Sequence, residues 1–299
     1  MSRAILLVAC LAAIAVLVFW GRPEGQGAVA GRIAFVSDQS GDPEIYTVSP
    51  DGTELRRTTW TPGTDWSPTW SWDNGFIAFC RSGGDIEEVW RMAADGSDQI
   101  RLTPRASGWC PSWSPDGRTI AFSSSRDGWA HIFLMNSDGT GVRRLGSFGR
   151  PNYDPAFSPD GRSIAFLYGN YGSDNIAVVP YPYDGSAPKA LTNDSGFFHR
   201  DLTWSPDGSK IAFCGNPDDD WDIFVINARD GSNCRRLTSG AEEDRHPTWS
   251  PDGSHLAFSR KWQGTSGIYL VDRGGGYVRP VLDTPANESE PDWSHARRR

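Results

Sequence analysis

The pentapeptide "WSPDG" stands at residues 113–117, 204–208 and 249–253, and "FSPDG" stands at 157–161. A catalytic motif is needed once, whereas a structural turn is needed wherever the chain reverses. Proline presets φ at the first corner of a turn, aspartate can hydrogen-bond the local backbone, and glycine accepts the positive φ that closes the hairpin. The recurring pentapeptide therefore predicts one β-hairpin in each copy of a repeated unit.

Two further markers keep the same register along the chain. A triplet Ile-Ala-Phe, or Leu-Ala-Phe in the last copy, begins at Ile33, Ile77, Ile120, Ile164, Ile211 and Leu256. Twelve residues after each of these lies an aliphatic residue, usually followed by an aromatic one: Ile45, Val89, Ile132, Ile176, Ile223 and Ile268. Because independent markers share one period of about 45 residues, the sequence predicts six copies of one unit.

Each unit is expected to contain four short strands. The first carries the pattern P-x-W-S, the second the Ile-Ala-Phe triplet, the third the aliphatic-aromatic pair, and the fourth segments such as "RRLT" at 235–238. In five units an Asp-Gly pair, which strongly favours a tight hairpin, separates the third strand from the fourth. The last unit has "DRGGGYV" (Asp272–Val278) there instead. Four antiparallel strands at this period are typical of a blade, so we predict an all-β, six-bladed propeller over residues 31–294.

The two ends of the repeat complete each other. The first unit begins directly at an Ile-Ala-Phe strand and lacks the P-x-W-S strand, while "EPDWS" at Glu290–Ser294 supplies an unpaired one. Pairing of this C-terminal strand with the N-terminal strands would close the ring and remove its open edges. Residues 295–299 read as a basic tail.

The first thirty residues differ from the rest. A short basic start is followed by Ala4–Trp20, seventeen apolar residues without a charge. We interpret residues 1–30 as a signal peptide or a retained membrane anchor with a short linker, which would place the remainder outside the cytoplasm, in the periplasm or on the exterior. The formal net charge of -8 argues against nucleic-acid binding.

The cysteines outside the apolar segment have no metal-ligand spacing; they are Cys80, Cys110, Cys214 and Cys234. An exported location permits disulfides, and Cys80 with Cys110 is the pair to test. The alternative is that all four are small buried thiols.

The order Trp-Ser-Pro-Asp-Gly, Ile-Ala-Phe, Ile-Tyr, Asp-Gly and Leu-Thr resembles the propeller repeat of the TolB family, and less closely eukaryotic WD repeats. The resemblance covers residues 31–294 and implies a scaffold role in the cell envelope. TolB proteins carry an α/β domain ahead of the propeller, for which this chain has no room between Trp20 and Gly31. Similar repeats occur in propellers of prolyl-oligopeptidase-type peptidases and in oligogalacturonate lyases.

Chain direction sorts the connections onto two faces. The S-P-D-G and Asp-Gly turns share one face, the turn face, and the variable loops and inter-blade connections share the other, the loop face. Because turn chemistry constrains the first, we expect binding on the second. The candidate partner-binding residues lie just before each inner strand: Asp65, Trp66, Trp109, Asn152, Tyr153, His199, Arg200, Asp244, Arg245, His246, Glu288 and Glu290. Alternatively, these charged groups pair across blades and tie the ring.

The function expected from these observations is non-enzymatic binding of an envelope protein or peptide at the channel mouth by a monomer without cofactors. A hydrolase elbow, Gly-x-Ser-x-Gly, is absent. The alternative is a polysaccharide-active, lyase-like enzyme or a sugar-binding propeller that uses a divalent metal near His199, His246 and Glu288.

Overall fold

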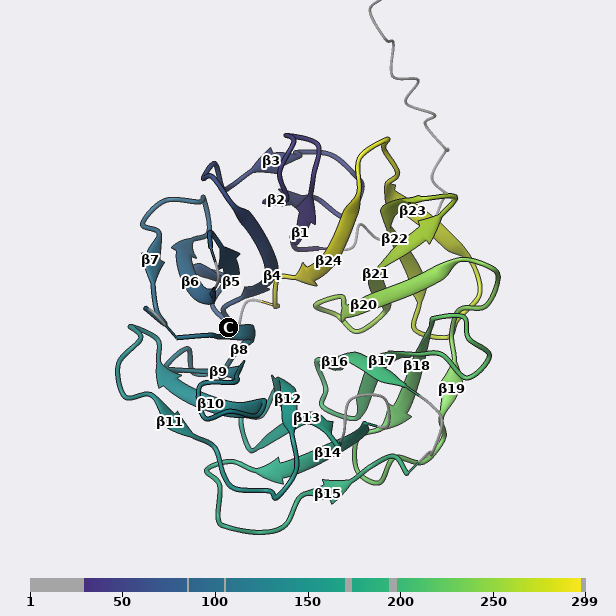
Figure 1. Cartoon of the computed structure of the whole chain (residues 1–299). Helices are drawn as coiled ribbons and strands as arrows, with labels where there is room; N and C mark the ends of the chain where they lie inside the picture. The colour runs from purple at the N-terminus through teal and green to yellow at the C-terminus, as the bar shows by residue number, and fades with distance from the viewer. Residues whose placement is uncertain (1–29, 85, 105, 170–173, 194–197, 297–299) are drawn as a thin grey trace, which may run out of the picture.

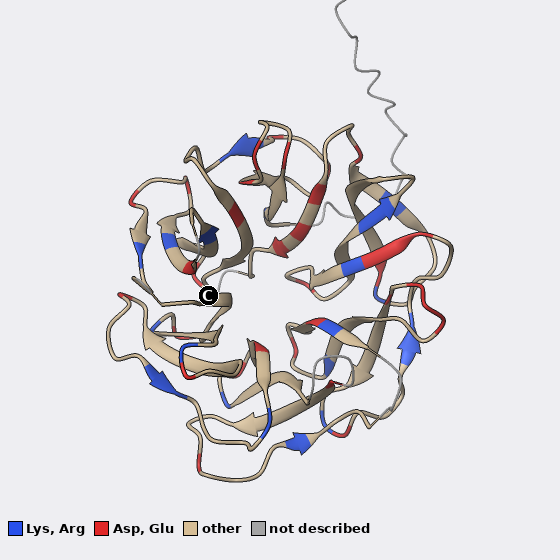
Figure 2. Ribbon diagram, in the orientation of Figure 1, with Lys and Arg blue, Asp and Glu red and all other residues tan. Residues whose placement is uncertain are grey.

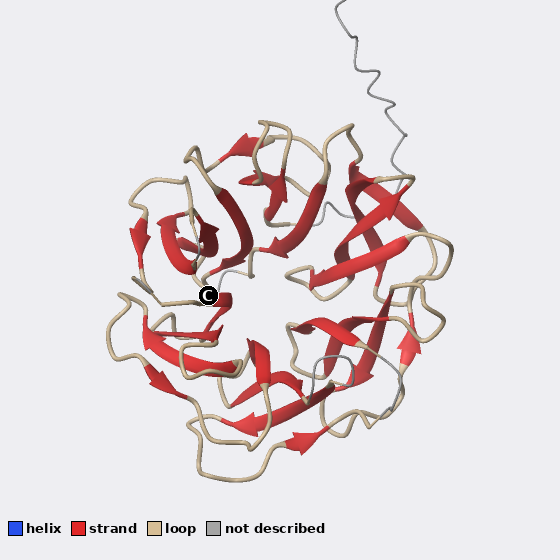
Figure 3. Ribbon diagram, viewed as in Figure 1, coloured by secondary structure: helices blue, strands red, loops and turns tan. Residues whose placement is uncertain are grey.

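The computed structural model describes residues 30–84, 86–104, 106–169, 174–193 and 198–296. Throughout these residues the secondary structure is β-strand, with no helix (Figure 3). Six four-stranded antiparallel sheets stand around a central axis like the blades of a propeller (Figure 1). The predicted all-β, six-bladed architecture is confirmed.

The strands repeat in the same order from the axis outward. The inner strands are β24 (Glu288–Trp293), β4 (Thr64–Trp70), β8 (Trp109–Trp113), β12 (Asn152–Phe157), β16 (His199–Trp204) and β20 (Glu243–Trp249). The second strands are β1 (Ile33–Ser37), β5 (Phe76–Ser82), β9 (Thr119–Ser124), β13 (Ser163–Tyr168), β17 (Lys210–Gly215) and β21 (His255–Trp262). The third strands are β2 (Glu44–Val48), β6 (Glu87–Ala93), β10 (His131–Asn136), β14 (Asn175–Pro180), β18 (Asp222–Asn227) and β22 (Thr265–Asp272). The outer strands are β3 (Arg56–Arg57), β7 (Ile100–Arg101), β11 (Arg143–Arg144), β15 (Lys189–Ala190), β19 (Arg235–Arg236) and β23 (Val278–Leu282). We number the blades 1 to 6 in this order.

Blade 1 is assembled from both ends of the chain. Its inner strand β24 pairs antiparallel with β1, and Trp293 lies opposite Ile33. The Trp293 side chain is only 1% exposed, and its indole N–H donates to the carbonyl oxygen of Ala30 at 3.0 Å. The C-terminal strand therefore closes the ring as the sequence predicts.

The apolar core lies between neighbouring blades. One cluster joins Ala257 and Ile268 of blade 6 to Ile33, Phe35 and Trp293 of blade 1. The phenylalanine of every Ile-Ala-Phe or Leu-Ala-Phe triplet is fully buried. Because a single blade cannot bury both of its faces, this packing between blades holds the ring together.

Glycine closes the S-P-D-G turns for the expected reason. Gly117, Gly161, Gly208 and Gly253 all adopt φ between +67° and +70°. In blade 2 the corresponding turn reads Ser71-Trp72-Asp73-Asn74, and Asn74 takes φ +60°. Asparagine tolerates this left-handed region better than most residues, so the turn is kept although its sequence differs.

The N-terminal apolar segment Ala4–Trp20 lies outside the described residues. Within the residues that the structure does describe, no helix has the length and apolar character needed to cross a membrane. The interpretation of residues 1–30 as a signal peptide or anchor stays a prediction.

The four cysteines of the propeller are free thiols. Cys80 and Cys214 are buried and Cys110 is half-buried, but Cys234 is exposed, because it follows the Asp-Gly turn that leads to the outer strand β19. The backbone N–H of Cys110 donates to the sulfur of Cys80, and burial raises the pKa of the Cys80 thiol. A disulfide between these two stays a prediction for oxidised protein.

Candidate functional site

Every inner strand carries a β-bulge at the same level. In blade 2, Trp66 pairs with Cys80 and Thr69 with Ala78, so Ser67 and Pro68 together oppose one residue of β5. The first residue of each bulge adopts a left-handed φ of 49° to 56°. We call these six the bulge residues: Ser67, Cys110, Asp154, Asp201, His246 and Glu290.

Proline marks the bulge in the sequence. A proline follows five of the six bulge residues, and Leu202 follows the sixth. Proline has no N–H to give to a strand ladder, so within sheets it is confined to edges, strand starts and bulges. The proline of the P-x-W-S pattern thus leaves the ladder at this point, and the side chain before it lines the axis instead of pairing in the sheet.

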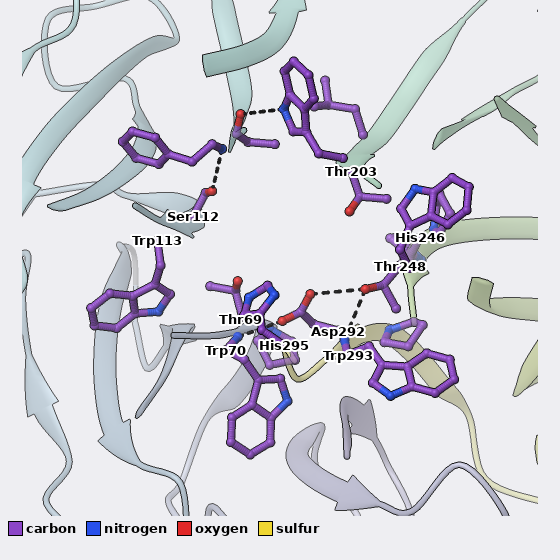
Figure 4. A pocket seen from close by; sticks show the side chains of 18 of the residues that line it. Thr69, Trp70, Ser112, Trp113, Thr203, His246, Thr248, Asp292, Trp293 and His295 are labelled. Atoms are coloured by element: carbon purple, nitrogen blue, oxygen red, sulfur yellow. Dashed lines mark hydrogen bonds between the residues drawn. The ribbon is translucent and has the colours of Figure 1, made fainter. Parts of the chain in front are cut away.

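An axial channel with a cavity volume of about 430 Å³ runs between the inner strands. The bulge residues line it, and so do the residues two positions further along each strand (Figure 4): Thr69, Ser112, Ala156, Thr203, Thr248 and Asp292. Among the described lining residues there is no lysine or arginine. The charged side chains of the channel wall are therefore carboxylates, and they stand among tryptophan and proline side chains; His246 is the only histidine at the level of the bulges.

The charged residues of the outer strands and those of the channel wall are opposite in sign (Figure 2). The charged residues of the outer strands β3, β7, β11, β15 and β19 are all lysine or arginine. The channel wall carries Asp154, Asp201, Glu290 and Asp292. Because low-dielectric walls focus the field of like charges, a cationic group is attracted toward the axis.

Three of the channel carboxyl groups, those of Asp154, Glu290 and Asp292, hold protons more readily than ordinary ones. Burial, and then the neighbouring Asp201 carboxylate, raise the pKa of Asp154 to about 7. Burial also raises the pKa of Asp292 to about 7 and raises the pKa of Glu290. His246 Nε2 lies 3.6 Å from Asp201 Oδ2. Near neutral pH the Asp154 and Asp292 carboxyl groups can therefore act as either hydrogen-bond donors or acceptors.

The same side chains also join neighbouring blades. Adjacent inner strands belong to different sheets, and side chains bridge the gap between them. Glu290 Oε2 accepts the backbone N–H of Ser67 at 2.6 Å, and Asp154 Oδ2 accepts that of Asp201 at 3.0 Å. The acidic residues of the channel are thus ties between blades as well as lining.

Six of the residues predicted to bind a partner are buried in the blades, Tyr153 among them at 5% exposed. Asp65, Asn152, His199, Asp244 and Glu288 are at most 2% exposed and occupy one equivalent position, two residues before the bulge. Asp65 forms a bidentate ion pair with Arg81 at 2.6 and 2.7 Å, and Asp244 forms the same pair with Arg260 at 2.7 and 2.8 Å. These ion pairs neutralise the carboxylate charges that were expected to face the channel mouth.

The other three residues at this position, His199, Asn152 and Glu288, are also fixed by hydrogen bonds. His199 Nδ1 lies 2.7 Å from the carbonyl oxygen of Asp174. Asn152 Oδ1 accepts the backbone N–H of Ile132 at 3.0 Å. Thr284 donates to Glu288 at 2.5 Å, and burial raises the pKa of Glu288 to about 7. These contacts anchor the preceding connection and the preceding blade to the inner strand.

The next predicted residues directly precede the bulge. Trp66 lines the channel, and Trp109 packs against a core cluster between blades. Arg200 donates from Nη1 to the hydroxyl of Tyr153 at 2.7 Å. The guanidinium carbon of Arg245 lies 4.2 Å from the ring centre of Trp221. Arg200, Arg245 and the two tryptophans are half-buried, so part of each remains accessible near the mouth.

Of the twelve predicted residues, Trp66, His246 and Glu290 line the channel together. The lining residues missed by the sequence analysis include Ser67, Cys110 and Asp292. The sequence signal that could have identified the bulge residues is their position directly before the proline of each P-x-W pattern. His199, His246 and Glu288 do not converge, and within the described ranges no group of three or more His, Cys, Asp or Glu is placed to share a metal ion.

Three solved structures illustrate the similarity of the fold. TolB from Acinetobacter baumannii superposes with a TM-score of 0.78 at 22% identity, covering 90% of this chain and 68% of that chain. A proposed TolB from Agrobacterium tumefaciens gives 0.70 at 22% identity, covering 87% and 92%. A chain of the nidogen/laminin complex gives 0.69 at 13% identity, covering 89% and 98%. At these identities the comparison shows a shared fold.

No curated protein is significantly similar to this chain in sequence. The profile of the TolB beta propeller domain, in contrast, matches residues 87–200 and 201–298, which is most of the chain. The match falls on the same repeats that form the blades of the structure. The chain therefore belongs to the TolB β-propeller family.

Proposed function

We propose that the protein is an exported, non-enzymatic propeller that binds a protein or peptide partner at the loop-face mouth of its channel. The binding residues in this proposal are Trp66, Asp201, His246 and Glu290, with Arg200 and Arg245 at the rim. Binding in this form requires no metal or cofactor.

The observation that carries the proposal is the channel itself. It is a concave cavity of about 430 Å³ in which the polar bulge residues stand among apolar side chains, including Trp66. The Asp201 and His246 side chains are 27% and 29% exposed. Concave sites that combine an aromatic surface with a few convergent polar groups are the usual form of binding sites. Acidic walls favour a partner segment with a basic side chain.

Site-specific photocrosslinking in the native cell tests the partner directly. A photoreactive amino acid at Trp66 should yield a defined adduct that mass spectrometry identifies, and an Asp201→Asn, Glu290→Gln double substitution should reduce its yield. The matched control places the same photoreactive group at Trp129, which is 67% exposed in the connection between β9 and β10. Equal adducts from the two positions, or none from Trp66, would refute binding at the channel.

Export is a separate part of the proposal. It is supported by the uninterrupted apolar run Ala4–Trp20 after a basic start. Fractionation of the native cells should recover the propeller from the periplasm or the membrane, and deleting Ala4–Trp20 should shift it to the cytoplasm. Recovery of the intact chain from the cytoplasm would contradict export without bearing on the channel.

A polysaccharide-active enzyme is the second candidate, because of one local feature. The pKa of Asp154 is raised to about 7, with Asp201 beside it and His246 near Asp201. A carboxyl group that titrates near neutral pH is suited to general acid or base catalysis. Release of unsaturated products from polyuronides, abolished by His246→Ala, would favour this function. A metal that co-purifies stoichiometrically would do so as well.

A further inference from the structure

The turn face is joined around the ring by contacts between successive S-P-D-G turns. A Cβ atom built on Gly161 would lie 3.5 Å from Pro115 Cδ of the preceding blade, and one on Gly253 would lie 3.5 Å from Pro206 Cδ. Proline of one turn thus packs against glycine of the next. These contacts form the rim of the channel on the turn face.

The joint between blades 1 and 2 is built differently. Blade 1 has Ser294-His295-Ala296 where other blades have Ser-Pro-Asp, and blade 2 has Trp72 and Asn74 where they have proline and glycine. The two departures from the repeat lie next to each other in space. The imidazole of His295 stacks on the indole of Trp72, with ring centres 3.9 Å apart and planes at 2°.

Backbone hydrogen bonds fix the same joint. The N–H of His295 donates to Asn74 Oδ1 at 2.9 Å, and its carbonyl oxygen accepts from Asn74 Nδ2 at 2.9 Å. Trp72 also reaches the next blade, because its Nε1 donates to the carbonyl oxygen of Trp113 at 3.2 Å. A single side-chain amide therefore satisfies both backbone groups of His295, and a stacked ring covers its imidazole.

This joint borders the channel. His295 and Ala296 belong to the lining, together with turn prolines such as Pro206 and Pro251. Figure 4 shows His295 at the edge of the channel beside Thr69 and Trp70. A movement of His295 and Ala296 would therefore alter the width of the channel opening on the turn face.

We propose that His295–Ala296 is a releasable latch, which seats on Trp72 and Asn74 and narrows the channel on the turn face. With the latch seated, a ligand reaches the bulge residues from the loop face. Release leaves the ring closed, because Trp293 remains buried and β24 remains paired with β1. Ser294 stays in blade 1, because its N–H donates to the carbonyl oxygen of Arg32 and its hydroxyl accepts the N–H of Arg32, each at 2.8 Å.

Two substitutions release the latch in this proposal. Asn74→Gly restores the residue that four other blades use at this φ and removes both hydrogen bonds to His295. Trp72→Pro restores the usual turn residue and removes the stack. The hydrogen exchange of the His295 amide should accelerate by about tenfold or more in Asn74→Gly, the change expected for losing a hydrogen bond.

Access to the channel is measured by thiol labelling. Thr203→Cys, in a Cys234→Ser background, places a thiol in the channel wall on the turn-face side of Asp201. The rate at which the thiol of Thr203→Cys reacts with a bulky maleimide is divided by the rate for native Cys110. Because Cys110 lies at the level of the bulges, its rate reports how fast the reagent enters from the loop face. Both latch substitutions should raise this ratio several-fold.

Pro115→Ala is the matched control, because it alters an equivalent turn that does not contact His295. The proposal is overturned if the control raises the labelling ratio as much as Asn74→Gly does. It is also overturned if His295 exchanges at the rate of an unprotected amide in the unmodified protein. Should Trp72→Pro fail to fold, Asn74→Gly decides alone, since glycine is native at this φ elsewhere in the ring.

Discussion

At Asp292, burial and hydrogen bonding act in opposite directions on one carboxyl group. The N–H of Trp70 donates to Asp292 Oδ2 at 2.7 Å and stabilises the charged form, but burial outweighs it and raises the pKa to about 7. In the unfolded chain an aspartate has a pKa of about 3.9. The folded state therefore binds the proton more tightly. The resulting stability is complete below pH 4 and is lost as the pH rises through 7.

The melting temperature should consequently be lower at pH 8 than at pH 5, by roughly 5 °C or more if the shift amounts to a few kcal/mol. Asp292→Asn, which keeps an oxygen for the Trp70 N–H, should flatten this dependence. The control is Asp184→Asn, since hydrogen bonds from Ser186 lower the pKa of this exposed turn residue. Circular dichroism melts across the pH range measure the effect. A dependence that is equally steep in Asp292→Asn would contradict the assignment.

At the scale of the element, contacts with a neighbouring blade determine where the turns and bulges of a blade lie. The Asp-Gly turns show this, because equivalent glycines have different surroundings. Gly185 and Gly231 both adopt positive φ, at +88° and +73°. A Cβ atom on Gly185 would have nothing within 4 Å, whereas one on Gly231 would overlap the carbonyl oxygen of Leu191 in the preceding blade.

Alanine at these two positions separates backbone strain from close approach. Gly185→Ala should cost about 1 kcal/mol, because only the left-handed conformation is penalised. Gly231→Ala should cost about 2 kcal/mol more, because two blades must also move apart. Thermal or urea unfolding of the two variants gives the difference. Equal losses would show that the Asp-Gly turn of blade 5 does not approach blade 4 as closely as the structure indicates.

The sequence predicts repeated elements far better than the side chains that face the axis. The turn and triplet motifs recur, so strand order, blade number and ring closure could be predicted from their spacing. The β-bulge arises from the register between paired strands, and its only local signature in the sequence is a proline. Because the bulge was not recognised, Asp65 and His199 were expected at the mouth, whereas the structure buries them, and Ser67 and Cys110 were missed.

At the scale of the whole molecule, ring closure depends on one strand that is distant in sequence from its partner. Trp293 links blade 1 to itself through β1 and to blade 6 through the shared core. Trp129 is 67% exposed and joins no blade interface. Two tryptophans of one chain therefore differ almost completely in what they contribute to the fold.

Trp293→Ala should destabilise the protein by about 3–5 kcal/mol, the usual loss for truncating a buried aromatic residue. Trp129→Ala should change the stability by no more than about 0.5 kcal/mol. Size-exclusion chromatography should also detect a larger, partly opened form of Trp293→Ala, because an unpaired β1 exposes a strand edge. If the two variants melt at the same temperature, the closure by β24 does not hold the ring together.

The use of channel carboxylates as ties between blades limits how this molecule can evolve. Glu290 and Asp154 cannot be exchanged freely for the sake of a new ligand, since each also holds the backbone of a neighbouring blade. Thr203 and Ala156 line the same space, and within the described part of the chain neither side chain holds the backbone of a neighbouring blade. Natural variants that acquire new specificities should therefore diverge first at these two wall positions, while the tying carboxylates stay the same.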